Sequence, residues 1–208
     1  GNRWFSRQSR FRIEAELIRD NALAVSGLLV KTIGGSSIKP YQPEGYYSYL
    51  NFPKRVYQTS SGVSQYKRGI YMHWQRTFLH PMLLAFDAPS REQCVAQRPI
   101  SNTPLAALTL LNDPTFVESA RALAVRVIQE GGATDRDRVA WLYSHVLSRN
   151  PDELEREVLQ ELVRVHRGHY DKNPQEADRL LVIGNYRVPS NLNRMEVAAW
   201  ISACRVML

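Results

Sequence analysis

The chain has 208 residues, of which 44% are hydrophobic and 23% charged, and its formal net charge is +7. This composition is typical of a soluble globular domain and excludes a disordered chain, and no apolar run reaches the roughly 18–20 residues that a membrane-spanning helix needs. The basic residues are spread among acidic neighbours and no nucleic-acid-binding module is recognisable, so a solvated basic surface is favoured over a nucleic-acid site.

The first third of the chain combines one helix with a long irregular region. A helix is predicted over residues 10–26, where apolar residues recur at helical spacing and Gly27 stands in the place of a C-terminal cap. Residues 31–69 are rich in Gly, Pro, Ser and Tyr, which is typical of an extended loop. Alternating apolar and polar residues over 70–75 predict a short strand, with residues 56–58 as its partner in a small hairpin.

The rest of the chain shows repeated helix-start signals. Thr103 and Asp113 are capping residues followed by proline at the first helical position. Capping boxes mark further starts, in the pairs Thr134 with Asp137, Asn150 with Glu153, Asn173 with Glu176 and Asn193 with Glu196. A short buried turn or helix is predicted around Pro81. The main predicted helices are 104–112, 114–130, 135–148, 151–168, 174–183 and 194–207.

Together these elements predict a mainly α fold, a helical bundle with a long Gly/Pro/Tyr-rich loop and room for one small β-hairpin. We interpret residues 1–208 as a single domain that is an incomplete C-terminal portion of a larger protein. Its parts are an N-terminal helix (1–30), a loop and hairpin region (31–100) and the helical bundle (101–208).

No established catalytic motif occurs in the sequence, so no catalytic residue is assigned. The sequence lacks GxSxG, HExxH, Walker and dinucleotide-binding patterns, and without CxxCH it cannot attach c-type haem covalently. His166 and His169 have a spacing that could hold a metal, but a solvated helix end closed by Gly168 is favoured. For Cys94 and Cys204, two buried thiols are favoured over a disulfide.

The strongest candidate for a ligand site lies around the polar loop of residues 101–103. Arg98 leads into this loop ahead of a helix N-terminus, and spare N–H groups together with an arginine suit an anion. We place Arg76, Asp87, Arg98 and Asn102 in this candidate site. The favoured alternative is a structural salt bridge between Arg98 and Asp87 that pins the loop to the bundle.

Aromatic residues suggest a second kind of ligand. Tyr46, Tyr47, Tyr71 and Trp74 could supply an aromatic platform for a carbohydrate, although packing of these rings beneath the long loop is favoured. We include Tyr71 and Trp74 among the candidate ligand-binding residues. The ligand expected for such a site is a polysaccharide or an anionic group.

A series of short segments, in order along nearly the whole chain, resembles a known family. They are 12–20 (RIEAELIRD), 24–27 (AVSG), 40–45 (PYQPEG), 68–71 (RGIY), 74–77 (WQRT), 86–89 (FDAP), 102–105 (NTPL), 110–114 (LLNDP), 198–200 (AAW) and 205–208 (RVML), with Cys94 and Arg98. On these segments the chain resembles the planctomycete-specific C-terminal domain of unknown function.

The resemblance implies an exported multidomain parent protein with a signal peptide and often a c-type cytochrome domain, which would hold the haem. It also implies that the domain begins upstream of residue 1 and continues past residue 208, and that the other domains of the parent are its partners. The family offers no established catalytic residues to carry over. We therefore expect a non-catalytic interaction or scaffolding module. The alternatives are a carbohydrate-binding or carbohydrate-active domain, and then nucleic-acid binding through basic charge.

Overall fold

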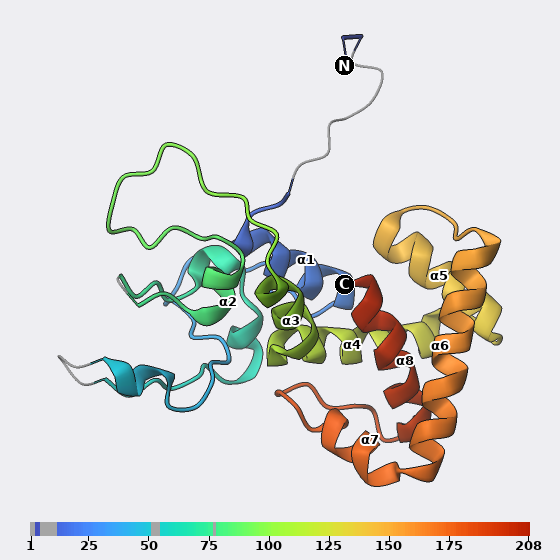
Figure 1. Cartoon of the computed structure of the whole chain (residues 1–208). Coiled ribbons are helices and arrows are strands. Elements are labelled where there is room, and N and C mark those ends of the chain that lie inside the picture. Colours follow the sequence, from blue (N-terminus) through green and yellow to red (C-terminus); the bar gives the residue numbers. More distant parts are fainter. Residues whose placement is uncertain (1–2, 5–11, 51–54, 77) are drawn as a thin grey trace.

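The structure of the protein is a computed structural model that describes residues 3–4, 12–50, 55–76 and 78–208. Within these ranges the regular secondary structure is helical, with eight α-helices and three short 3₁₀ helices, η1–η3. Figure 1 shows α1–α3 and the long loop on one side of the molecule, α5–α8 on the other side, and α4 running between them. The prediction of a mainly α fold with a bundle and a long loop is confirmed.

The first group of helices packs α1 (Ala15–Ser26), α2 (Pro81–Ala85) and α3 (Pro104–Asn112) with the start of α4 (Pro114–Glu130). The predicted first helix begins at residue 15 instead of residue 10, because Glu14 is extended; residues 10 and 11 lie outside the described part of the chain. Gly27 caps α1 as expected. The core of this group includes Leu83 and Phe86, whose ring meets that of Phe116 edge-on at 6.0 Å.

The long loop between α1 and α2 carries only short helices, which are η1 (Tyr46–Tyr49), η2 (Gly62–Tyr66) and η3 (Gly69–Tyr71). The predicted strand over 70–75, and with it the hairpin to 56–58, is wrong, since the described residues contain no strand. Met72 forms one isolated β-bridge with Ile38, and this bridge does not extend into a strand.

Contact with α1 explains why the alternating pattern does not form a strand. Directly before this segment, the Gly69 N–H donates to Asp20 Oδ1 at 2.6 Å, so the chain enters the segment bound to α1. The approach is close, because a Cβ on Gly69 would lie 2.7 Å from the backbone oxygen of Glu16. The chain therefore turns at this point, and tertiary contact overrides the local preference for a strand.

The second group is the bundle of α4 with α5 (Asp135–Leu147), α6 (Glu153–Lys172), α7 (Pro174–Leu181) and α8 (Arg194–Met207). Helix α8 lies at its centre and contacts each of the other four helices. Its Trp200 is fully buried, and the indole Nε1–H donates to Glu196 Oε1 at 2.9 Å. Each helix contributes apolar side chains to one continuous core, among them Leu123, Leu142, Val163, Leu181 and Ile201.

Side-chain caps confirm most of the predicted helix starts. They are Thr103 for α3, Asp113 for α4, Thr134 for α5 and Asn193 for α8. At α7 the preceding Asn173 makes no side-chain cap, and its amide donates to the backbone oxygen of His169 at 3.0 Å. The bounds of these helices follow the prediction closely because a cap is a local interaction among four or five consecutive residues.

Helix α6 corrects two predictions. Its cap is Asp152, which forms a full capping box with Glu155. The helix therefore starts two residues later than the capping box predicted at Asn150 would place it. Gly168 does not end the helix, which continues to Lys172. A glycine inside a helix costs only about 1 kcal/mol, and the packing of α6 on α8 outweighs it.

The two cysteines have different environments, and neither is in a disulfide. Cys204 is buried in α8, where burial raises the pKa of its thiol, whereas Cys94 is exposed on the loop between α2 and α3. The expectation of a buried thiol is therefore confirmed for Cys204 and wrong for Cys94. Among the described residues, no helix combines the length and the apolar character needed to cross a membrane.

Candidate functional site

The loop between α2 and α3 (residues 86–103, the α2–α3 loop) projects from the molecule in Figure 1 and is closed at its base by Asp87. The Asp87 carboxylate accepts hydrogen bonds from the Ser101 N–H (2.8 Å) and hydroxyl (2.7 Å), and from Arg12 Nη1 at 3.2 Å. The bonds from Ser101, and then the charge of Arg12, hold the pKa of this carboxyl below its usual value. Asp87 thus fastens both ends of the loop to the residues before α1.

Arg98 fastens the same loop to α1. Its guanidinium donates to both carboxylate oxygens of Glu16, at 2.7 and 3.1 Å, and lies 3.0 Å from a carboxylate oxygen of Glu14. Burial by itself would raise the pKa of Glu16, but the hydrogen bonds and charge of Arg98 outweigh burial and lower it. Arg98 and Asp87 therefore each pin the loop through a partner of their own, without pairing with each other.

A cavity of about 440 Å³ lies between this loop and the start of α1. Its lining combines the charged residues Arg12, Glu14, Asp87 and Arg98 with apolar ones that include Phe86. A second hollow of about 340 Å³ adjoins it between α1 and α3, and Asn102 lines this one instead. The structure thus brings Asp87 and Arg98 into one cavity and places Asn102 in the neighbouring hollow.

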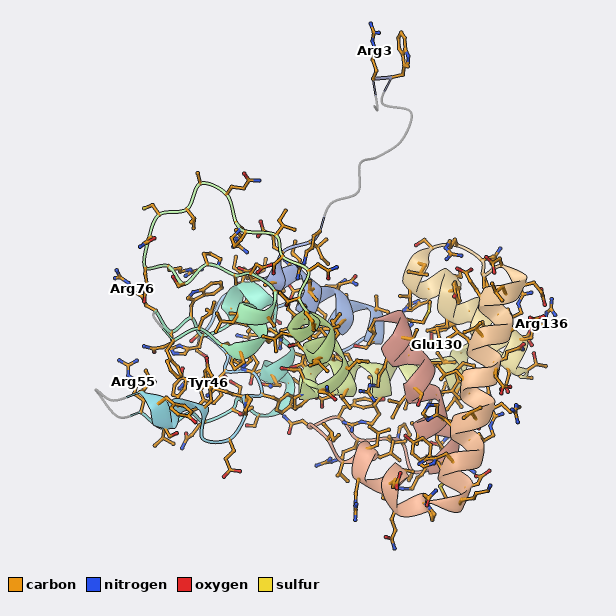
Figure 2. All side chains as sticks on the ribbon, in the orientation of Figure 1. Arg3, Tyr46, Arg55, Arg76, Glu130 and Arg136 are labelled. Atoms are coloured by element: carbon orange, nitrogen blue, oxygen red, sulfur yellow. The ribbon has the colours of Figure 1, made fainter. Side chains whose placement is uncertain are left out.

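The other three predicted site residues are elsewhere. The Tyr71 hydroxyl accepts from the Gly34 N–H at 2.7 Å, within the long loop. The guanidinium of Arg91 lies 4.1 Å from the centre of the Trp74 ring, so Trp74 supports the outer part of the α2–α3 loop. Arg76 is exposed, and Figure 2 shows it at the outer edge of the molecule. None of the three lines the cavity that contains Asp87 and Arg98.

The histidine pair of α6 does not form a ligand cluster. His166 and His169 lie inside α6, and His169 Nε2 is 2.7 Å from Glu176 Oε2 of α7. Across the described ranges, no group of three or more His, Cys, Asp or Glu side chains is arranged to hold a metal ion.

A buried polar centre that sequence reasoning missed joins the long loop to the bundle at Glu118 of α4, whose side chain is 1% exposed. Its carboxylate accepts from the hydroxyls of Tyr41 (3.0 Å) and Tyr66 (2.9 Å) and from the Tyr186 N–H. Arg121, one turn later and fully buried, lies 3.7 Å from it. The signal available in the sequence was a Glu and an Arg three residues apart within the mostly apolar first part of this helix.

Two other buried side chains complete this centre. Arg19 of α1 is fully buried and donates to the backbone oxygens of Lys67 (2.7 Å) and Gln65 (2.5 Å), which fixes the loop on α1. His80 lies within hydrogen-bond distance of the Tyr41 backbone oxygen (2.8 Å) and caps α2 by accepting from the Met82 N–H. Burial lowers the pKa of His80 to about 4, so the ring is neutral at pH 7. These contacts make the buried centre a structural joint.

The fold and the site define a class of protein, an all-α domain with a long pinned loop and a partly charged surface cavity. Residues 1–163 match the family described as "Protein of unknown function (DUF1553)", and the chain belongs to this family. The match runs from the N-terminus into α6, so the closing segments 198–200 and 205–208, which also carried the resemblance, lie beyond it. No curated protein and no solved structure matches the chain.

Proposed function

We propose that this domain is a non-catalytic docking module that binds an apolar segment of a partner protein through α3. The observation that carries the proposal is the exposure of leucines on this helix. Helix α3 reads PLAALTLLN and has no charged residue, yet only Ala106 is buried. Leu105, Leu108 and Leu111 are 57%, 54% and 41% exposed. We call these three residues the α3 leucine face.

The spacing of the leucines makes the face continuous. Residues three apart on a helix are neighbours on its surface, so the three side chains form one apolar stripe. Exposed Leu154 and Val158 on α6 differ, because Glu157 and Glu161 stand beside them. Contiguous apolar surface without charge is typical of a protein contact.

The hollow between α1 and α3 is lined by residues of α3 other than the leucine face and offers the partner a second apolar contact. It has a volume of about 340 Å³, an apolar lining that includes Ile18, Leu110 and Leu208, and no acidic side chain. Arg12 lines it, and Arg205 donates to the Leu111 backbone oxygen at the end of α3. An amphipathic helix with apolar residues on the α3 leucine face and acidic residues toward Arg205 would be complementary.

The family resemblance supports a partner within the same parent protein. On this proposal the parent is exported, the docking helix belongs to another of its domains, and a c-type cytochrome domain of the parent carries any haem. The role of the present chain is to hold that domain in place.

Thiol labelling tests the proposal. Leu108→Cys is made in a Cys94→Ser background, so that within residues 1–208 the buried Cys204 is the only other thiol. The rate of maleimide labelling is compared between the 208-residue chain and the full-length natural protein. We expect labelling at least tenfold slower in the full-length protein, and no such difference for a matched Val158→Cys control on α6.

Equal labelling rates at position 108 in the two proteins would contradict docking through α3. Protection in the 208-residue chain that grows with its concentration would instead indicate a second copy as the occupant and would overturn the partner proposed here.

A further inference from the structure

The outer part of the long loop carries two cations, Lys39 and Arg55, that belong to no ion pair among the described residues. Arg55 Nη1 donates to the neutral amide oxygen of Gln75 at 2.7 Å, and the Lys39 ammonium lies 5.8 Å from the centre of the Tyr57 ring. Both charges act on His73, since burial first, and then the charges of Lys39 and Arg55, lower its pKa. Among the ion pairs of the described residues, none includes Lys39 or Arg55.

A cavity of about 530 Å³ opens beside these cations. Arg55 and Tyr57 belong to its lining, so it is continuous with the charged group, and Figure 2 shows Arg55 and Tyr46 together at this end of the molecule. This volume lies within the usual range for small-ligand pockets, about 300–1,000 Å³. The remaining lining side chains include Gln42, Glu44, Tyr46, Tyr47 and Thr59.

The walls of the cavity are held rigidly by aromatic packing. The ring of Tyr47 meets Tyr57 edge-on at 5.0 Å, and the ring of Tyr46 lies 4.6 Å from Phe78. The hydroxyls of Tyr46 and Tyr57 donate to backbone oxygens of Leu79 and Pro40, which fixes the orientation of both rings. A cavity with fixed walls binds a ligand without first ordering the side chains around it.

The polar groups of the lining suit a hydroxylated ligand. The Glu44 carboxylate accepts hydrogen bonds, the Thr59 hydroxyl both donates and accepts, and the Gln42 amide oxygen is buried without a partner. Nucleic acid fits less well, because neighbouring rings cover much of the faces of the tyrosines, which leaves little room for stacked bases.

We propose that this cavity, with Arg55 in its lining and Lys39 beside Tyr57, binds an acidic saccharide. The sugar ring enters the cavity, and its carboxylate or sulfate group lies against the cations. The site is separate from the cavity of Asp87 and Arg98 and does not depend on docking through α3.

Calorimetric titration of the 208-residue chain at low salt tests this site with four probes: a galacturonate tetrasaccharide, a sulfated carrageenan tetrasaccharide, neutral maltotetraose and a thymidylate 12-mer. We expect at least one acidic tetrasaccharide to bind and maltotetraose not to bind. The acidic probe that binds identifies the anionic group as carboxylate or sulfate. Arg55→Ala should weaken this binding at least tenfold, since Arg55 supplies a charge-assisted donor.

Arg136→Ala is the matched control, because Arg136 is an exposed arginine of α5 on the far side of the molecule in Figure 2. It should leave the affinity unchanged. Equal weakening by the two substitutions would show attraction to overall charge and would overturn the site. Failure of both acidic tetrasaccharides to bind, or tighter binding of the thymidylate that is lost in Arg55→Ala, would also overturn it.

Discussion

The buried ring of His80 should make this domain lose stability in mild acid. In the folded protein, burial lowers the pKa of His80 to about 4, and the positive charge of Arg19 nearby acts in the same direction. In the unfolded chain a histidine titrates near its ordinary value of about 6.5. Between these two values the unfolded state binds a proton that the folded state does not bind.

The sign and size of the effect follow from this difference. The stability that the neutral ring provides is complete above about pH 6.5 and is lost as the pH falls toward about 4. One pKa unit is worth about 1.4 kcal/mol, so His80 alone should lower the free energy of unfolding by about 2 kcal/mol between pH 7.5 and pH 5.

Urea unfolding followed by tryptophan fluorescence at pH 7.5, 6 and 5 measures this loss, and His80→Asn isolates the contribution of the ring. Asparagine can still accept the Met82 N–H as a helix cap but does not titrate. The variant should be less stable at pH 7.5, because it gives up the contact with the Tyr41 backbone oxygen. Its further loss from pH 7.5 to pH 5 should be about 2 kcal/mol smaller than that of the natural protein. Identical pH dependence in both would refute the reasoning.

Two further predictions concern side-chain environments. Gly184 has φ +80, and a Cβ there would lie 2.7 Å from the carboxyl carbon of Glu118. Gly184→Ala should therefore destabilise the protein by about 1–3 kcal/mol more than Gly34→Ala, which has a similar φ of +88 but open space around it; equal losses in urea unfolding would contradict the clash. In a thiol assay on the native protein, Cys94 should react quickly and Cys204 only after unfolding, because burial shields Cys204 and raises its pKa. Two fast-reacting thiols would show that α8 is not packed as described.

The α2–α3 loop shows which contacts could be predicted from the sequence and which could not. That Asp87 and Arg98 would pin a loop was foreseeable, because charged residues stood at its two ends. Their partners were not, since Glu16 and Arg12 are 82 and 75 residues away from Arg98 and Asp87. The alternation over residues 70–75 predicted a strand because it is a local pattern, and the contact of Gly69 with α1 decided otherwise.

The sequence by itself determined the helical class of the protein and the bounds of most helices. Caps such as Thr103 and Asp113, each followed by proline, bind N–H groups within one turn of the chain. Both partners of each hydrogen bond can therefore be identified from the local sequence. Only the tertiary structure decided that Glu118 would accept hydrogen bonds from two tyrosines of the long loop, and that leucines of α3 would remain exposed. Burial and pairing of charges depend on which distant surfaces meet, and that information exists only once the chain is folded.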